Sequence, residues 1–145
     1  MIEWAQQRCT EVVVFVNTKQ GEAVPGHLRA QWLQELHPAA HVVQVEHNLH
    51  NDWDDQELWA RWIELLQSKW PITSGPSSKG PEVVVSSDFY IAELARRLGA
   101  LPLICDPERA HVPISATLIR NDPATHLELL APQVRDWVER NWLNM

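Results

Sequence analysis

The sequence predicts an α/β fold built on a doubly wound parallel sheet with helices on both faces. Short runs of β-branched residues alternate along the chain with longer stretches of helical periodicity. The short runs are almost continuously apolar, which is expected for strands buried on both faces of a parallel sheet. The stretches between them are long enough to form the right-handed crossover helices that join parallel strands.

Four strands are expected, at residues 12–16, 42–45, 83–85 and 101–105. The first three consist mostly of valine, and the fourth reads Leu-Pro-Leu-Ile-Cys. The chain has 145 residues, a usual length for one domain, so we expect residues 1–145 to form a single domain.

Three helices are expected between these strands, because apolar residues recur there at spacings of three and four. Asp54-x-x-Glu57 is typical of a capping box at the start of the second helix, and Gly99 is typical of a left-handed C-cap after the third.

Residues 52–57 include four acids, which we expect to be capping and dipole partners rather than metal ligands. Residues 71–81 are expected to be a surface connector. The apolar positions are Leu28, Trp32, Leu33 and Leu36; Leu58, Trp59, Trp62, Ile63, Leu65 and Leu66; and Ile91, Leu94, Ala95 and Leu98.

The composition argues against several classes of protein and partner. The formal net charge is −7 and Lys and Arg cluster nowhere, so we expect neither nucleic acid nor a membrane as a partner. Cys9 and Cys105 do not have the spacing of a metal site, which favours a reducing cytosol. The first residues carry charges where a signal peptide needs an apolar core, and no long apolar run follows. We therefore expect a cytoplasmic protein.

Eight tryptophans supply an unusual number of flat rings. Trp32, Trp59, Trp62 and Trp137 lie at helical spacing with aliphatic residues, and we expect them in the core. Trp53 follows the second strand, where its indole would either stack on a planar ligand or pack as a hydrophobic staple ahead of the next helix. Both interpretations stay open.

Candidate site residues follow from the geometry of the sheet. Open parallel sheets bind ligands beyond the carboxyl ends of their strands, so we consider the side chains that come directly after each strand. These are Asn17, Thr18, Lys19, His27 and Arg29 after the first strand; His47, Asn48, His50, Asn51, Asp52 and Trp53 after the second; Ser86, Ser87, Asp88 and Tyr90 after the third; and Asp106, Arg109 and residues 112–120 after the fourth.

Residues 115–120 combine the groups of a phosphate site. Ser115 and Thr117 are N-cap residue types at an expected helix start, where free N–H groups and the helix dipole favour an anion. Arg120 adds a planar, permanently charged fork of five donors. The alternative is an ordinary capped helix with an exposed arginine, and it stays open.

Residues 114–120, Ile-Ser-Ala-Thr-Leu-Ile-Arg, resemble the I-S-x-T-x-x-R signature of the nucleotidyltransferase superfamily. Residues 85–90, 105–109 and 121–123 (Val-Ser-Ser-Asp-Phe-Tyr, Cys-Asp-Pro-Glu-Arg and Asn-Asp-Pro) extend the match. With them the chain resembles nicotinamide-nucleotide adenylyltransferases, especially the bacterial type found in bifunctional NAD-regulator proteins. The resemblance covers about residues 2–137, and it implies a Rossmann-like nucleotidyltransferase fold.

The resemblance also implies a reaction, the transfer of AMP from ATP, accompanied by Mg²⁺, to a nicotinamide mononucleotide-type acceptor with release of pyrophosphate. Ser115 and Thr117 would hold the ATP phosphates as catalytic groups, and Arg120 would meet the β- or γ-phosphate. Arg29 would bind the acceptor phosphate and Trp53 its ring. The nucleotide-binding set implied in this way is Ser86, Ser87, Tyr90, Arg29, Trp53, Asp106 and Arg109. Two alternatives stay open: another cytidylyl- or adenylyltransferase of the superfamily, and a non-catalytic nucleotide sensor or interaction module.

The superfamily opens with a strand, a Gly-rich turn and an H-x-G-H motif, whereas residues 1–9 resemble the helix that comes after that motif. We therefore expect an N-terminally truncated domain whose first, central strand is missing, which is costly because each buried unpaired backbone group costs about 1–3 kcal/mol. We favour a start codon upstream of Met1 as the explanation. There are three alternatives: the chain is a decayed remnant, the neighbouring strands pair directly with each other, or a strand is recruited from another chain. The last alternative leaves a homo-oligomer open. Without the two histidines we expect weak nucleotide binding and little or no turnover.

Overall fold

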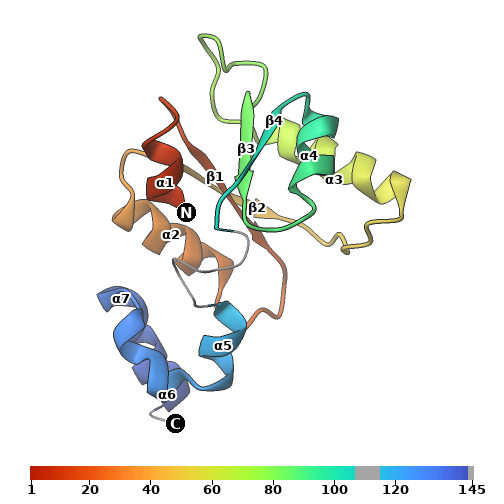
Figure 1. The fold of residues 1–145 in the computed structure, drawn as a ribbon. Helices are drawn as coiled ribbons and strands as arrows, with labels where there is room; N and C mark the ends of the chain where they lie inside the picture. Colours follow the sequence, from red (N-terminus) through yellow and green to blue (C-terminus); the bar gives the residue numbers. More distant parts are fainter. Residues whose placement is uncertain (107–114, 144–145) are drawn as a thin grey trace. The chain divides into compact units, whose positions relative to one another are not determined.

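A computed structural model describes residues 1–106 and 115–143 (Figure 1). The chain divides into two compact units, Met1–Pro107 and Glu108–Met145. We describe each unit by itself.

The first unit is a mixed α/β structure with parallel strands, as the sequence predicts. Helix α1 (Ile2–Gln6) leads into β1 (Val13–Thr18), α2 (Gly26–Leu36) and β2 (His41–Glu46). Helix α3 (Gln56–Ser68), β3 (Val83–Ser86), α4 (Ile91–Leu98) and β4 (Leu101–Ile104) complete the alternation. Helix α2 packs on β1 and β2, and α4 packs on β3 and β4 and touches α3 (Figure 1).

The strands form two separate two-stranded sheets instead of one continuous sheet. Strand β1 pairs with β2 from Val13 opposite His41 to Thr18 opposite Glu46. Strand β3 pairs with β4 from Val83 opposite Leu101 to Ser86 opposite Ile104. Among the described residues, each strand therefore keeps one edge that no ladder occupies. This arrangement matches the predicted strand positions and parallel direction, but not the predicted single sheet.

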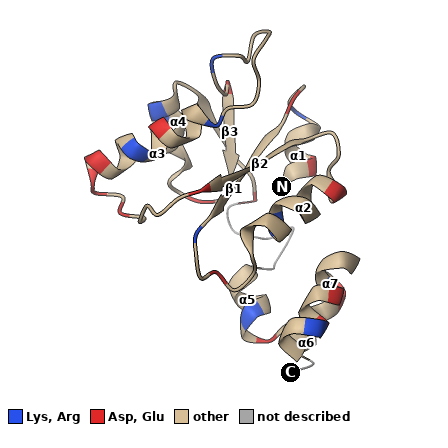
Figure 2. Ribbon diagram, turned by 180° about the vertical axis from the view of Figure 1, so that it is seen from behind, with Lys and Arg blue, Asp and Glu red and all other residues tan. Residues whose placement is uncertain are grey.

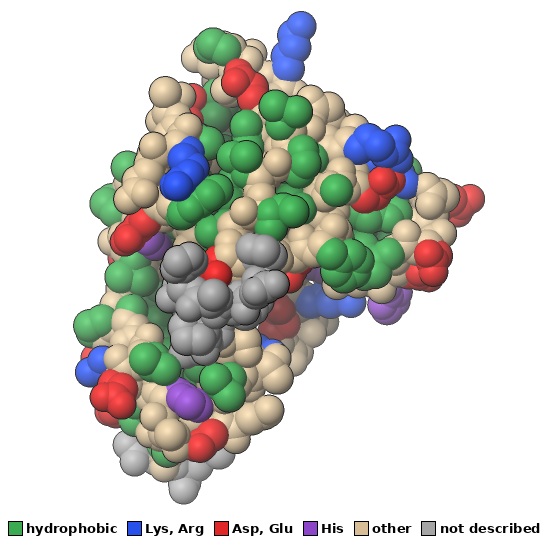
Figure 3. Space-filling model, viewed as in Figure 1, with side chains coloured by type: hydrophobic (Ala, Val, Ile, Leu, Met, Phe, Trp, Pro, Cys, Tyr) green, Lys and Arg blue, Asp and Glu red, His purple; other side chains and the backbone are tan. Residues whose placement is uncertain are grey.

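The fourth predicted strand is less buried than its sequence suggests. On β4, Leu101 is 69% exposed and Ile104 is 55% exposed. Figure 3 shows hydrophobic side chains gathered at the surface of the first unit over β3 and β4. Among the described residues β4 pairs only with β3, so it lies at an edge of its sheet, as each strand of the two sheets does.

Local signals set the ends of the helices. Asp55 caps α3, with its carboxylate accepting the Leu58 N–H at 3.1 Å, so the cap lies one residue after the predicted Asp54. Gly99 ends α4 in the left-handed conformation with φ 73°, as predicted. At the start of α2, a Cβ on Gly26 would lie 1.9 Å from Cγ2 of the buried Thr18, so only glycine fits there.

The second unit is helical in its described part. It contains α5 (Ala116–Asn121), α6 (Pro123–His126), the 3₁₀ turn η1 (Leu127–Leu129), α7 (Pro132–Val138) and the π-helical turn η2 (Glu139–Leu143). The guanidinium of Arg135 donates to the carbonyls of Leu127 and Leu130, which ties α7 to the preceding turn. Among the described residues of both units, no helix is long and apolar enough to cross a membrane.

Candidate functional site

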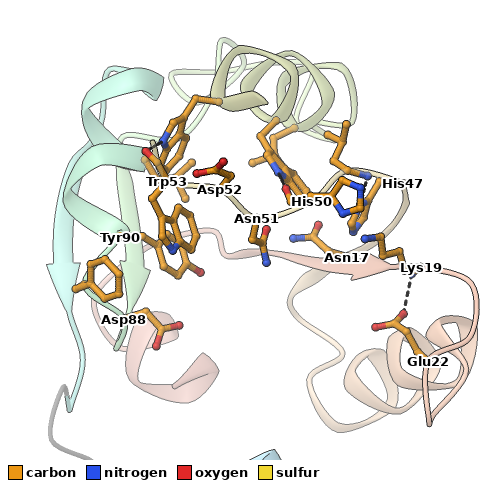
Figure 4. Close-up of a pocket in the computed structure, with 16 residues that line it drawn as sticks. Asn17, Lys19, Glu22, His47, His50, Asn51, Asp52, Trp53, Asp88 and Tyr90 are labelled. Atoms are coloured by element: carbon orange, nitrogen blue, oxygen red, sulfur yellow. Dashed lines mark hydrogen bonds between the residues drawn. The ribbon is translucent and has the colours of Figure 1, made fainter. Parts of the chain in front are cut away.

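A cleft of about 690 Å³ lies in the first unit where β1, β2 and β3 end. This is the edge at which parallel sheets bind ligands, so the position of the cleft agrees with the prediction from strand geometry. Figure 4 shows aromatic side chains at one end of the cleft and polar side chains at the other. The lining residues are Asn17, Lys19 and Glu22 after β1; His47, Leu49, His50, Asn51, Asp52 and Trp53 after β2; Trp59, Trp62 and Leu66 on α3; and Asp88, Phe89, Tyr90 and Leu94 after β3.

The aromatic end is built around a stacked pair, Trp53 and Tyr90. Their ring centroids lie 4.9 Å apart with an interplanar angle of 10°. Phe89 meets Trp53 edge-on at 6.1 Å and is itself 81% exposed. Trp53 is 43% exposed, so part of its surface remains available for stacking with a planar ligand. The loop after β2 and the loop after β3 are thus joined by aromatic contact at the mouth of the cleft.

Two tryptophans of α3 hold the loop after β2 in place. The indole N–H of Trp59 donates to the carbonyl of Trp53 at 3.0 Å, and that of Trp62 donates to the carbonyl of His50 at 2.9 Å. Trp59 is only 5% exposed, and its ring also contacts Trp53 at 5.5 Å. The buried indole of Trp59 needs an acceptor for its N–H, and the acceptors of both indoles are carbonyls of the loop that lines the cleft.

Helix α4 contacts the ring of Trp59 through Arg97. The guanidinium of Arg97 lies 4.9 Å from the centroid of Trp59 and also donates to Gln56 and, at 2.7 Å, to Glu93. Arg96 adds two bonds to Glu93, and these arginine bonds lower the pKa of the Glu93 carboxyl to about 2. The positive charge of Arg97 is therefore matched by a carboxylate on its own helix.

The polar end of the cleft consists of hydrogen-bonding groups from the ends of β1 and β2. His47 Nδ1 accepts the Leu49 N–H at 3.0 Å, so the neutral ring carries its proton on Nε2, where it can donate. Burial, and next the nearby charge of Lys19, lower the pKa of His47 below its usual value, which favours that neutral form. Figure 4 shows Asn17 and Lys19 beside His47, with Asn51 between them and the aromatic end.

The structure brings together only part of the predicted nucleotide-binding set. Trp53 and Tyr90 line the cleft side by side. Ser86, Ser87, Arg29 and Asp106 do not line it. The structure explains two of these positions.

Ser86 is buried at the end of β3, where its hydroxyl accepts the Asp88 N–H at 3.1 Å and thereby shapes the turn after the strand. The guanidinium of Arg29 forms an ion pair with Glu22 at 2.6 Å and donates to the carbonyl of Asn17 at 3.3 Å. Arg29 itself does not line the cleft, but it bonds two residues that do. The Glu22 carboxylate also accepts the backbone N–H of Lys19 at 2.7 Å, which fixes the turn after β1.

The predicted phosphate segment lies in the second unit. The Ser115 hydroxyl accepts the Leu118 N–H at 3.2 Å, so Ser115 is the N-cap of α5 as predicted. The Thr117 hydroxyl accepts a bond from Arg120 at 3.4 Å instead of capping the helix. These bonds are those of the ordinary capped helix that the sequence left open. Arg109 lies outside the described residues.

Sequence reasoning missed what Trp59 and Trp62 do, because their helical spacing predicts core positions alone. The signal for Trp59 is its indole N–H, which needs an acceptor because the ring is buried. Of the four acids in residues 52–57, Asp52 accepts the Asp54 N–H at 3.1 Å and Asp55 caps α3, in agreement with the capping interpretation. Within residues 1–106 and 115–143, no three His, Cys, Asp or Glu side chains gather as a metal site.

No protein-family model matches the chain, and no curated protein sequence matches it.

Proposed function

We propose that the first unit binds a mononucleotide in the cleft and that the chain is an adenylyltransferase-like nucleotide-binding domain of doubly wound, Rossmann-like ancestry. The observation that carries this proposal is the stacked Trp53–Tyr90 pair at the carboxyl ends of parallel strands. Trp53 is 43% exposed, and the exposed part of an indole ring can stack with a planar base. A cleft of about 690 Å³ is also within the usual size of small-molecule sites.

The polar end supports the same ligand class. A mononucleotide carries a planar ring at one end and a phosphate at the other. In this proposal the ring stacks on Trp53, and the phosphate meets the ammonium of Lys19 and the Nε2–H of His47 at the far end (Figure 4). Both groups come from turns that begin where a strand ends, so the sheet sets their spacing.

The reaction that the sequence resemblance favours is adenylyl transfer. An oxygen of the acceptor phosphate would attack the α-phosphorus of ATP, the bond from that phosphorus to the β-phosphate oxygen would break, and pyrophosphate would leave. The protein's part would be positioning and charge stabilisation, with Mg²⁺ arriving on the ATP phosphates. Ser115, Thr117 and Arg120 are the residues proposed to meet ATP. Because the 145 residues contain no H-x-G-H motif, we expect nucleotide binding with little turnover.

Calorimetry tests the binding proposal. Titration of the chain with nicotinamide mononucleotide should give one site with a dissociation constant below about 1 mM. Trp53→Leu should weaken binding by about 5-fold or more, since stacking on an aromatic side chain contributes roughly 1–3 kcal/mol per base. Trp4→Leu is the matched control, because the Trp4 ring on α1 contacts the guanidinium of Arg8 and does not line the cleft. Binding that is absent, or equally weakened by both substitutions, would refute the proposal.

A second measurement separates a sensor or weak transferase from an interaction module. Phosphorus NMR of the chain with ATP, Mg²⁺ and the mononucleotide would detect pyrophosphate if transfer occurs. We expect ATP binding that Arg120→Ala abolishes and little pyrophosphate. Failure of ATP to bind at all would support the interaction-module alternative.

A further inference from the structure

A second cavity, of about 310 Å³, lies in the first unit where α3 ends and before β3 begins. Its lining residues come from Phe15 on β1, the end of α3, the loop of residues 71–81 and Leu98 at the end of α4. It shares a single described lining residue, Leu66, with the cleft proposed to bind a mononucleotide. The cavity therefore lies at the opposite end of β3 from that cleft, and its volume is at the lower limit for small-molecule sites.

The buried and half-buried side chains of this cavity are mostly apolar. The rings of Phe15 and Trp70 are in contact, with centroids 6.3 Å apart and an interplanar angle of 54°. Leu66, at 9% exposure, and Leu98 extend the apolar lining. The indole N–H of Trp70 already donates to the Ser77 carbonyl at 2.7 Å, so the ring offers a ligand its apolar surface. The lining thus favours a ligand with an apolar body.

The charge of the cavity comes from one lysine. Lys79 is exposed and is the one charged residue among the described residues of the lining. The loop of residues 71–81 contains no other charged side chain (Figure 2). Glu82, the nearest acid along the sequence, does not line the cavity, and Lys79 forms no ion pair within residues 1–106 and 115–143. In a chain with 19 acidic residues against 12 Lys and Arg, this cavity has the charge that suits an anion.

The same loop adds hydrogen-bonding groups. Thr73 and Ser78 both line the cavity, and neither hydroxyl forms a hydrogen bond within the described part of the chain. A hydroxyl donates readily to a carboxylate, and a lysine ammonium both donates to a carboxylate and pairs with its charge. The loop therefore supplies donors to the cavity, and its sequence contains no carboxylate that would repel an anion.

We propose that this second cavity binds a small carboxylic acid with an apolar, ring-bearing body. The body lies against Phe15 and Trp70, and the carboxylate meets the ammonium of Lys79. The inference does not rest on the proposed function, because the second cavity includes neither the stacked aromatic pair nor Lys19 of the first cleft. A neutral ligand of the same shape gains only the apolar contact, and an amine is in addition repelled by Lys79.

Three ligands of similar shape and different charge test the proposal: phenylpropionate, phenylpropanamide and phenylpropylamine. An NMR titration of the full 145-residue chain should give a dissociation constant of about 1 mM for the acid, as expected for a ligand of this size. The acid should bind about two- to fivefold tighter than the amide, the range for one exposed ion pair, and the amine should bind weakest. Raising the salt concentration from about 50 to 500 mM should reduce the difference between acid and amide.

Acetate tests the apolar lining, because it carries the same charge without a ring. It should bind about tenfold weaker than phenylpropionate or worse, since it cannot bury a ring against the two aromatic side chains. Equal binding of acetate and phenylpropionate would show a simple surface ion pair and would overturn the proposal.

Two lysine variants assign the charge effect. Lys79→Gln should remove the preference for the acid over the amide. Lys69→Gln is the matched control: Lys69 is the C-cap residue of α3 and does not line the cavity, so the preference should stay unchanged. The indole signal of Trp70 should move on binding and that of Trp53 should not, because Trp53 lines only the first cleft. Circular dichroism checks that each variant folds.

The remaining outcomes also decide. Equal affinities for acid and amide, or equal losses in the Lys79 and Lys69 variants, would overturn the proposal. A Trp53 signal that moves in place of the Trp70 signal would place the acid in the first cleft and would overturn it too. If no ligand moves the Trp70 signal and sedimentation shows a dimer, a second copy covers the cavity and the proposal is wrong. None of these results bears on nucleotide binding, which the calorimetry above tests separately.

Discussion

Replacing Trp59 with phenylalanine should loosen the loop after β2 and leave the rest of the first unit ordered. The substitution keeps an aromatic ring in the buried site and removes the indole N–H that donates to the Trp53 carbonyl at 3.0 Å. A hydrogen bond of this kind contributes about 0.5–1.5 kcal/mol net, which corresponds to roughly a 2- to 13-fold change in the opening equilibrium of the loop. The amide of Asp54, which bonds to Asp52 within that loop, reports the change.

Hydrogen exchange followed by mass spectrometry measures this effect without any ligand. Exchange in residues 47–55 should rise by that factor in Trp59→Phe. Trp70→Phe is the matched control, because the Trp70 indole N–H donates to the Ser77 carbonyl at 2.7 Å in a different loop. It should raise exchange in residues 71–81 and leave 47–55 unchanged. Equal exchange in both loops for both variants would refute the role assigned to Trp59.

Three further predictions concern stability. Gly26→Ala should lower the free energy of unfolding by about 1–3 kcal/mol in urea denaturation, because the new Cβ would overlap the side chain of Thr18. The pKa of His47 is lowered in the folded chain, so the unfolded chain binds the proton more readily as pH falls. The urea midpoint should therefore decrease as pH drops below the usual His pKa of 6.5. The decrease should be smaller in His47→Asn. Arg97→Gln should lower the melting temperature more than Arg96→Gln, because only Arg97 lies against a buried tryptophan ring, and equal shifts would contradict this.

The sequence predicted the positions and direction of the strands because those depend on local composition. Runs of valine favour strands, and apolar stretches at helical spacing between them require crossover helices, whichever strands finally pair. Strand pairing is a tertiary property, and the periodicity of β1 and β3 carries no information about their unpaired edges. The edge position of β4 has a signal in the sequence, since Pro102 within the run is typical of an edge strand.

The candidate site was predicted in its place and only partly in its members. The rule that ligands bind at the carboxyl ends of strands located the cleft, and Trp53 and Tyr90 lie in it together. Arg29 was expected to reach a phosphate, but Glu22 holds it, and no spacing pattern encodes that ion pair. The N-cap of α3 is Asp55 instead of the predicted Asp54. The two residues are adjacent acids, and the local sequence does not determine which of them caps the helix.

The most direct test of the mononucleotide cleft is an amide and indole NMR spectrum of the chain recorded during titration with nicotinamide mononucleotide. The eight tryptophans give eight indole N–H signals, which report on separate parts of the molecule. The proposal predicts that the signal of Trp53 shifts most, that those of Trp59 and Trp62 shift with it, and that Trp32 and Trp70 stay unchanged. A Trp53 signal that does not move at saturating mononucleotide would contradict the proposal.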